Sequence, residues 1–316
     1  MVNDTNSTLP KIALGAWAWG NDGTFGGELG ADTLRPIFDA AMKQGLNLWD
    51  TAFAYGMGTS EKVLALFLKN LPRDSFLVSD KFTPQCVSEK SPAAFKNMIE
   101  MQLSLMNLDR FDIYWIHNVV DAPFWIEELA KYFEGSETAP LIGVSNHNLA
   151  EIKQAAQILR AHGLRLSAVQ NHYSLINRSS EDSGILSWCR ENGVTFFSYM
   201  VLEQGALSGK YDTAHPMPAG SARADTYNPV LDKLEVLNAK LKTLAEKHGV
   251  ETAQIPVSWA IAKGTLPIIG VTKTKHVDDA AKAAKVTLTK EEIADLEETA
   301  EKLNINAVRF WEKVMD

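Results

Sequence analysis

Short apolar runs alternate with longer amphipathic stretches along the whole chain. A short apolar run followed by an amphipathic stretch is typical of a strand followed by a helix. The pattern predicts strands at residues 12–17, 46–50, 76–81, 111–117, 141–145, 166–170, 194–199 and 266–270. It predicts helices at residues 32–44, 60–70, 92–106, 123–133, 149–162, 181–191, 230–248, 252–263, 277–284, 290–302 and 307–314.

Capping residues agree with several of these helices. Ser91 is a suitable N-cap with Pro92 at the first helical position, Ser60 can cap the helix that it begins, and Gly163 closes the helix at 149–162. Strands that alternate with helices indicate parallel βαβ units, and eight such units close into a barrel. We therefore predict an α/β fold, a single (β/α)8 TIM barrel over residues 1–316 with additional C-terminal helices. The alternative, an open doubly wound sheet, is disfavoured because no Gly-x-Gly-x-x-Gly follows an early strand.

Composition narrows the class of protein. The chain has 316 residues, of which 46% are apolar, enough for a substantial core. Its net charge of -8 argues against nucleic acid or an anionic membrane as the main partner. Cys86 and Cys189 lie far apart and match neither a disulfide framework nor a metal site. The N-terminus does not resemble a signal peptide and no apolar run approaches a membrane span, so we expect a soluble, cytoplasmic protein.

The predicted strands end on polar groups. In a barrel of this type, active sites lie at the C-terminal ends of the strands. Six consecutive predicted strands end at Asp50, Lys81, His117, Ser145, Gln170 and Tyr199. The opposite strand ends are apolar, so the sequence predicts a site at one rim of the barrel.

Asp50 and Lys81 end neighbouring strands, which lie about 4.8 Å apart, so an ion pair between them is expected. It could be a structural salt bridge that fills the barrel mouth. Tyr55, five residues after Asp50, favours a catalytic role, because an adjacent ammonium group lowers the pKa of a phenol. His117 could then donate a hydrogen bond to a substrate oxygen. The assembly would polarise a carbonyl group but has neither a paired nucleophile nor a metal-ligand cluster, so it requires a reducing cofactor.

These residues resemble those of the aldo-keto reductase family over nearly the whole chain. The segment Gly15-Ala16-Trp17-Ala18-Trp19-Gly20 resembles the family's first-strand signature. The motifs Asp50-Thr51-Ala52, Tyr55-Gly56, Lys81 and Ile116-His117 match its catalytic tetrad in order and context. Gly143-Val144-Ser145-Asn146 and Val169-Gln170-Asn171 match the strand ends that hold the nicotinamide carboxamide.

The resemblance implies reduction of an aldehyde or ketone with NADP(H), or NAD(H), and with Tyr55 as the general acid. It implies that Tyr199 stacks on the nicotinamide, that 200–205 covers the pyrophosphate, and that Ser208, Lys210 and Arg223 contact phosphates. The segments Gly205–Tyr211 and Ser221–Arg223 resemble the bacterial, potassium-channel β-subunit-like branch. The implied cofactor-binding residues are Ala16, Trp17, Asp50, Ser145, Asn146, Gln170, Tyr199, Met200, Val201, Leu202, Gln204, Gly205, Ser208, Lys210, Arg223, Gly270, Thr272, Lys273, His276 and Asp279.

The adenosine end departs from the family pattern. Thr272 and Lys273 could hold a 2′-phosphate with the help of a helix N-terminus. His276 stands where the family usually has Arg or Gln, and Ala280 replaces an adenine-contacting Asn, while Asp279 keeps the acidic position. A neutral His276 would weaken 2′-phosphate binding. We expect NADP(H) to be preferred, with NAD(H) as the alternative.

The substrate is expected to be a small-molecule carbonyl compound, with contacts from Trp19, Phe53, Tyr55 and His117. Trp17, Phe25, Phe82 and Trp115 are further candidates for an aromatic cleft, although aromatic residues pack equally well in a core. The loops at 21–30 and 119–122 and the segment Phe310-Trp311 would shape the pocket. His147, His162, His172, His215 and His248 are expected to be structural or surface residues, and Cys86 a plain small side chain.

Two other functions were considered. One is a redox-sensing, β-subunit-like binding protein that binds nucleotide with little turnover. The other is a barrel hydrolase or isomerase without nicotinamide, which Tyr199 and the loop after it disfavour. We expect a monomer or a homo-oligomer.

Overall fold

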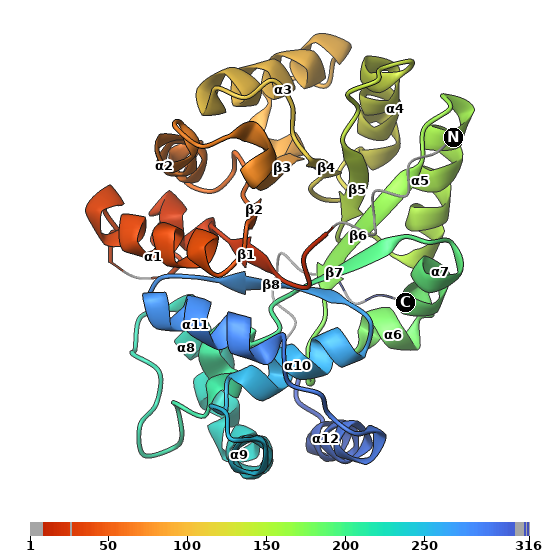
Figure 1. Cartoon of the computed structure of the whole chain (residues 1–316). Helices are drawn as coiled ribbons and strands as arrows, with labels where there is room; N and C mark the ends of the chain where they lie inside the picture. Colours follow the sequence, from red (N-terminus) through yellow and green to blue (C-terminus); the bar gives the residue numbers. More distant parts are fainter. Residues whose placement is uncertain (1–8, 26, 307–312, 314, 316) are drawn as a thin grey trace.

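Parallel strands close into a barrel in the part of the chain that the structure describes (Figure 1). The structure is a computed structural model that describes residues 9–25, 27–306, 313 and 315. Phe310, Trp311 and the predicted helix at 307–314, apart from Lys313, lie outside these residues. In order around the barrel, the strands are β1 (Ala13–Gly15), β2 (Leu48–Asp50), β3 (Leu77–Phe82), β4 (Ile113–Ile116), β5 (Leu141–Ser145), β6 (Leu166–His172), β7 (Thr195–Tyr199) and β8 (Leu266–Gly270).

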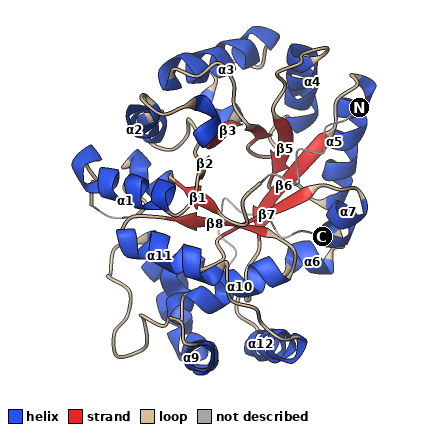
Figure 2. Cartoon of the chain, viewed as in Figure 1, coloured by secondary structure: helices blue, strands red, loops and turns tan. Residues whose placement is uncertain are grey.

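Helices surround the barrel on the outside (Figure 2). They are α1 (Ala31–Lys43), α2 (Thr59–Leu68), α3 (Pro92–Met106), α4 (Ala122–Phe133), α5 (Leu149–Ala161), α6 (Ser179–Asp182), α7 (Ile185–Glu191), α8 (Ala222–Tyr227), α9 (Leu231–His248), α10 (Gln254–Ala262), α11 (Thr274–Ala283) and α12 (Lys290–Leu303). Short 3₁₀ segments lie at Trp17–Gly20 (η2), Arg73–Ser75 (η3), Pro84–Cys86 (η4), Glu203–Ser208 (η5) and Asn228–Val230 (η6). The predicted (β/α)8 barrel is confirmed, and its closure excludes the open sheet.

Strand register brings the polar strand ends together. Asp50 pairs with Ser79, which places Lys81 just beyond the end of β2. Ser145 pairs directly with Gln170. The barrel closes where β1 pairs with β8, with Leu14 opposite Ile269. Because all neighbouring strands are parallel, their carboxyl ends form one rim.

Two apolar cores support that rim. The larger lies between strands and helices, and the smaller fills the barrel with Ala13, Leu48, Ile113, Trp115, Ala168, Phe197 and Leu266. Trp115 crosses the barrel directly over Gly143, where an added Cβ atom would lie 2.2 Å from the indole. A side chain at Gly143 is therefore incompatible with this position of Trp115.

Some helix boundaries were predicted correctly and others were not. The Ser91 side chain caps α3 by accepting a hydrogen bond from the Ala94 amide, as expected. The prediction that Ser60 caps α2 is wrong, because the N-cap is Gly58 and the Ser60 hydroxyl is buried and donates to the Ala16 carbonyl. The predicted single helix at 181–191 is also wrong: Gly184, with a φ of 80°, separates α6 from α7.

No helix among the described residues is long and apolar enough to cross a membrane. In the same residues, His, Cys, Asp and Glu side chains form no group of three or more that could hold a metal ion.

Candidate active site

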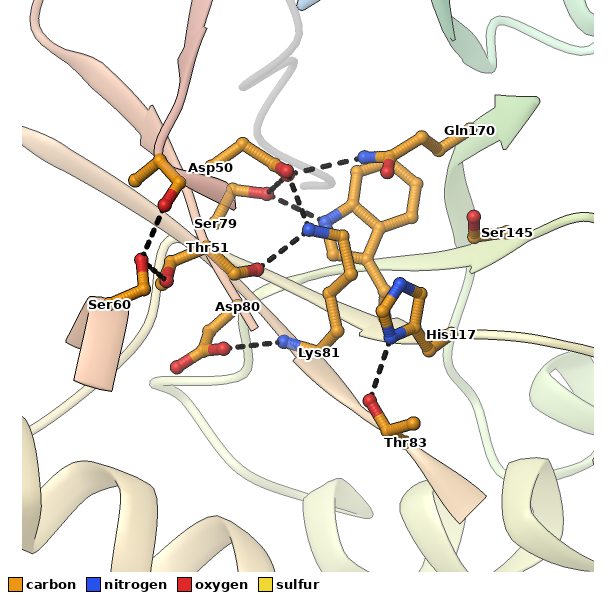
Figure 3. A network of polar contacts seen from close by, with 12 residues as sticks. Asp50, Thr51, Ser60, Ser79, Asp80, Lys81, Thr83, His117, Ser145 and Gln170 are labelled. Atoms are coloured by element: carbon orange, nitrogen blue, oxygen red, sulfur yellow. Dashed lines mark hydrogen bonds and ion pairs between the residues drawn. The ribbon is translucent and has the colours of Figure 1, made fainter. Parts of the chain in front are cut away.

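Asp50 at the end of β2 and Lys81 near the end of β3 form a buried ion pair at the rim (Figure 3). Lys81 Nζ lies 2.5 Å from Asp50 Oδ1, and the Lys81 side chain has no exposed surface. The ammonium group also donates to the Thr51 carbonyl oxygen at 2.6 Å. Burial alone lowers the pKa of Lys81, but Asp50 and Tyr55 outweigh burial and raise the pKa above its usual value. Lys81 is therefore held as a cation.

Neighbouring side chains fix the other oxygen of Asp50. Asp50 Oδ2 accepts hydrogen bonds from the Ser79 hydroxyl at 2.8 Å and from Gln170 Nε2 at 3.2 Å. The indole nitrogen of Trp115, which belongs to the core inside the barrel, donates to the Ser79 hydroxyl oxygen at 2.7 Å. Asp50 thus has a fixed orientation, so the position of the Lys81 ammonium is fixed as well.

Tyr55 lies against the ion pair. Lys81 Nζ is 4.9 Å from the centre of the Tyr55 ring, and Trp17 stacks on the same ring with a centroid distance of 5.5 Å. The loop that carries Tyr55 packs tightly, since a Cβ atom at Gly56 would lie 1.9 Å from the Gly20 carbonyl oxygen. Gly56 also has a φ of 67°, which favours glycine.

The expected net lowering of the Tyr55 pKa is wrong. Burial raises the pKa of Tyr55 above its usual value, and Lys81 opposes this effect without cancelling it. Tyr55 keeps some exposed surface at the rim, but packed protein atoms surround its titrating group. The phenol is therefore held in its protonated form, which is the form that donates a proton.

His117 lies one residue beyond β4 and faces Tyr55, with the two ring centres 5.9 Å apart. Burial and the nearby Lys81 lower the pKa of His117 to about 3, so the imidazole is neutral near pH 7. The Thr83 hydroxyl lies 2.7 Å from His117 Nδ1. When Thr83 donates to Nδ1, the ring proton is on Nε2, where it can be donated to a substrate oxygen.

A second buried polar cluster, formed by Glu61, Asp80, Gln102 and Tyr114, holds the backbone of Lys81. The Lys81 amide donates to Asp80 Oδ1 at 2.8 Å, and Gln102 Nε2 donates to the Lys81 carbonyl oxygen at 3.2 Å. Gln102 also donates to Glu61 Oε1 and accepts a hydrogen bond from the Tyr114 hydroxyl at 2.5 Å. Burial raises the pKa of both Glu61 and Asp80, and most strongly that of Asp80.

The ends of β5, β6 and β7 hold the residues predicted to contact the nicotinamide. Ser145 and Gln170 are side by side in the sheet register. The Asn146 amide donates to the Ser145 hydroxyl oxygen at 3.2 Å, and its oxygen accepts from the Tyr199 hydroxyl at 2.5 Å. Four predicted residues from three strand ends are therefore brought together, and Gln170 connects them to Asp50.

The residues predicted to contact phosphates lie along two further segments. In the loop after β7, the Ser208 hydroxyl donates to the Gly205 carbonyl oxygen at 2.6 Å. Lys210 and Arg223 lie over the ring of Tyr211, with their cationic groups 5.0 and 5.7 Å from its centre. The two basic residues, although 13 positions apart in sequence, therefore converge on one ring.

The start of α11 brings the adenosine-end residues close to that loop. Lys273 is the N-cap of α11, and the Thr272 amide donates to Nδ1 of His276 at 3.2 Å. Burial lowers the pKa of His276, and the lysines at 273, 275 and 210 lower it further. Asp279 accepts a hydrogen bond from Gln254 Nε2 at 2.9 Å. Exposed Gly270 ends β8 next to these residues.

One predicted substrate contact needs correction, and two predicted cofactor contacts are buried. Trp19 has no exposed surface and donates to the Val271 carbonyl oxygen at 2.8 Å, so it is a core residue and not a substrate contact. Ala16 is also fully buried, and Val201 keeps no more exposed surface than Ser145. Phe53 is partly buried and lies beneath Gly58. Met200, Leu202 and Gln204 keep some exposed surface in the same loop.

An aromatic wall lies beside Tyr55, and it is formed by two of the predicted candidates for an aromatic cleft. Trp17 stacks on Tyr55, and Phe25 packs edge-on against Trp17 at 5.0 Å. Phe82 and Trp115 are fully buried. Trp17, which was predicted to contact the cofactor, thus lies at the side of the proposed proton donor.

Sequence reasoning missed several residues at the site. Thr83 and Ser79 have no motif of their own, although Ser79 could have been noticed as a polar residue in the middle of a buried strand. His172, predicted to be a structural or surface residue, is buried, and its Nε2 lies 2.7 Å from the buried Glu203. Glu203 was noticed only as part of the loop after β7.

The chain is similar to known proteins over most of its length. The model of the aldo/keto reductase family matches residues 11–301. The chloroplastic pyridoxal reductase of Arabidopsis thaliana is 30% identical over 310 residues, covering 93% of this chain and 84% of the relative. The NADH-specific methylglyoxal reductase of Escherichia coli K12 is 26% identical and covers 96% of this chain and 98% of the relative.

Solved structures show the same fold. The glycerol dehydrogenase of Gluconobacter oxydans aligns with a TM-score of 0.82 at 23% identity, covering 96% of this chain and 94% of the other. An aldo/keto reductase from Klebsiella pneumoniae, in complex with NADP and acetate, aligns with a TM-score of 0.73 at 23% identity and covers 98% and 95% of the two chains.

Proposed function

We propose that this chain, which belongs to the aldo/keto reductase family, reduces a small aldehyde or ketone to an alcohol with Asp50, Tyr55, Lys81 and His117 as its catalytic residues. The chain is an NAD(P)H-dependent oxidoreductase. The observation that carries the residue assignment is that Tyr55 packs against a buried ion pair at the carboxyl rim and that His117 faces Tyr55. We take the barrel of residues 1–316 as the catalytic unit.

The chain's own residues fit a nicotinamide coenzyme. Gln204 Nε2 is buried without a hydrogen-bond partner among the described residues, and it belongs to the loop predicted to cover a pyrophosphate. Ser145, Asn146 and Gln170 present hydroxyl and amide groups at the rim, suited to a carboxamide. When bound, the reduced coenzyme supplies a hydride ion to the carbonyl carbon.

Tyr55 supplies the proton. As the carbonyl oxygen gains negative charge, the Tyr55 hydroxyl transfers its proton to that oxygen, and an alcohol forms. Lys81 stabilises the phenolate that remains, because its ammonium group lies beside the ring and is kept charged by Asp50. In the reverse oxidation, the Tyr55 phenolate accepts the proton.

His117 orients the substrate. Its neutral ring donates a hydrogen bond from Nε2 to the carbonyl oxygen, with the ring position set by Thr83. A neutral donor can polarise the oxygen without competing with Tyr55 as the acid. Trp17 and Phe25 form an apolar wall next to the reacting carbonyl.

The experiment is the exchange Tyr55→Phe. It removes the proton donor and keeps the ring between Trp17 and Lys81, so turnover of a carbonyl panel should fall by about a thousandfold or more. Binding of NADPH, followed by quenching of tryptophan fluorescence, should persist. Full turnover in this variant would refute the assignment, and loss of NADPH binding would show a disturbed site instead. Lys81→Met should give the same pattern.

We propose further that NADP(H) is preferred over NAD(H). Lys273 and Lys275 lie at the start of α11 and, with Lys210, lower the pKa of His276, whereas Asp279, which pairs with Lys275 at 3.1 Å, raises it. A 2′-phosphate is suited to lysines at a helix N-terminus. The exchange Lys273→Met should weaken NADPH binding and leave NADH binding unchanged. Equal effects on both coenzymes would contradict the preference.

Finer predictions of the sequence stay predictions. They are a cytoplasmic location, membership of the bacterial, potassium-channel β-subunit-like branch, and a monomeric or homo-oligomeric state. Sedimentation velocity of the purified protein decides the last of these. A survey of sugars, aromatic aldehydes and keto-steroids with both coenzymes identifies the substrate class.

A further inference from the structure

The loop after β7 has an unusual backbone. Met200, Glu203 and Gln204 have φ values of 61°, 47° and 52°, and Gly205 has a φ of 99°. Left-handed conformations cost a non-glycine residue about 1–2 kcal/mol each. Three such residues within five positions require strong interactions elsewhere that hold the loop in this shape.

Glu203 supplies those interactions. Its side chain is fully buried and accepts hydrogen bonds from His172 Nε2 at 2.7 Å, from the Ser174 hydroxyl and from the Tyr227 hydroxyl. Burial alone raises the pKa of Glu203, but these donors outweigh burial and hold the pKa below its usual value. An ionised carboxylate therefore joins the β7 loop to the end of β6, to the loop after it and to α8.

The same anchor reaches Tyr199 through His172. The His172 ring stacks on the Tyr199 ring, with centroids 5.6 Å apart and planes at 24°. Asn177 Nδ2 lies 2.9 Å from His172 Nδ1, and the Asn177 oxygen is held by Ser179. Nδ1 therefore accepts a hydrogen bond from Asn177, which leaves Nε2 to donate to Glu203.

We propose that Glu203 is a positioning residue for the coenzyme: through His172 it fixes the Tyr199 ring, and through Tyr227 it fixes the 200–205 loop. This inference rests on the proposed role of Tyr199 as the surface on which the nicotinamide stacks. Glu203 itself touches neither coenzyme nor substrate. Its loss is expected to weaken coenzyme binding while the hydride-transfer step of the loaded enzyme is retained.

The test uses two tyrosines that make the same kind of hydrogen bond. Tyr227→Phe removes the hydroxyl that donates to Glu203, and Tyr173→Phe removes a hydroxyl that donates to Glu181 of α6 at 2.8 Å instead. Loss of a hydrogen bond to a charged group in the anchor should raise the NADPH dissociation constant about tenfold in Tyr227→Phe. Tyr173→Phe should lower the melting temperature and leave that constant unchanged.

A third variant, Glu203→Gln, changes the anchor itself. Glu203→Gln keeps the size of the side chain, removes its charge and should also raise the dissociation constant. Single-turnover oxidation of bound NADPH, at coenzyme concentrations that saturate each variant, should stay within about twofold of the wild-type rate because the Tyr55 site is intact. If Glu203→Gln does not fold, Tyr227→Phe decides the question.

Tyr199→Ala separates this inference from the proposed function. If Tyr199→Ala leaves NADPH binding unchanged, the assignment of Tyr199 is wrong and the inference fails with it. If Tyr199→Ala weakens binding but Tyr227→Phe does not, only the inference fails. Equal weakening by Tyr227→Phe and Tyr173→Phe would also overturn it, since that result indicates general destabilisation.

Discussion

The buried Glu61–Asp80 pair makes stability depend on pH in a direction that can be calculated. Oε2 of Glu61 and Oδ2 of Asp80 have no hydrogen-bond partner among the described residues other than each other's carboxyl group. Two buried carboxylates cannot both be charged at low cost, so the pair keeps a proton. Burial and the Glu61 charge raise the pKa of Asp80 most strongly, which places the proton on Asp80.

The size of this pH dependence follows from the thermodynamic linkage between proton binding and folding. An unfolded aspartate has a pKa of about 3.9, and folding raises that of Asp80, so the folded protein binds one more proton above about pH 4. The stabilisation from this proton is complete below about pH 4. It then falls by about 1.4 kcal/mol per pH unit until the raised pKa is reached.

Asp80→Asn removes this dependence. The asparagine amide supplies a permanent N–H donor to Glu61, and its oxygen can still accept the hydrogen bonds from the Lys81 amide and from Gln102. Urea unfolding of both proteins between pH 5 and 8 gives the difference in unfolding free energy. The wild type should lose stability relative to Asp80→Asn by about 1.4 kcal/mol per pH unit below the raised pKa.

Asp74→Asn is the control, because the Asp74 side chain is 92% exposed and forms only a surface ion pair with Arg110. The unfolding free energy of Asp74→Asn should change with pH in the same way as that of the wild type. The same pH dependence in wild type and Asp80→Asn would refute the assignment of a shared proton to this pair.

Two further predictions concern packing and orientation. Gly143→Ala should lower the free energy of unfolding by about 1–3 kcal/mol, because the new Cβ atom would lie 2.2 Å from Trp115. Urea unfolding measures this change. An unchanged urea midpoint would show that the indole of Trp115 moves freely. Thr83→Val removes the hydroxyl next to His117 Nδ1 and should reduce kcat/KM for a carbonyl substrate about tenfold, with NADPH binding unchanged. If Thr83→Val keeps the wild-type kcat/KM, Thr83 does not orient His117 for the reaction.

The sequence predicted the fold and the position of Asp50, Lys81 and His117 at one rim because both depend on repeated patterns. Alternating apolar runs and amphipathic stretches identified the strands, with β5 and β8 at the predicted bounds. The polar residue at each strand end then identified Asp50, Lys81 and His117, because parallel strands bring their carboxyl ends to one rim.

What the sequence could not supply were contacts that depend on the direction of single side chains. Trp17 and Trp19 are two residues apart in the η2 segment, yet one stacks on Tyr55 and the other is buried against Trp49. Nothing in their spacing distinguishes the two. The pKa of Tyr55 was mispredicted for a related reason, since the amount of packing around a side chain cannot be read from its neighbours in sequence.

The pairing of β1 with β8 has a consequence for synthesis of the chain. Leu14 and its neighbour Ile269 are far apart in sequence, so Leu14 is made long before Ile269. Until β8 emerges from the ribosome, one side of β1 and one side of β7 remain unpaired strand edges, which are surfaces prone to aggregation. The nascent chain therefore needs protection of these edges until β8 is available, and pairing of β8 with β1 and β7 then covers them.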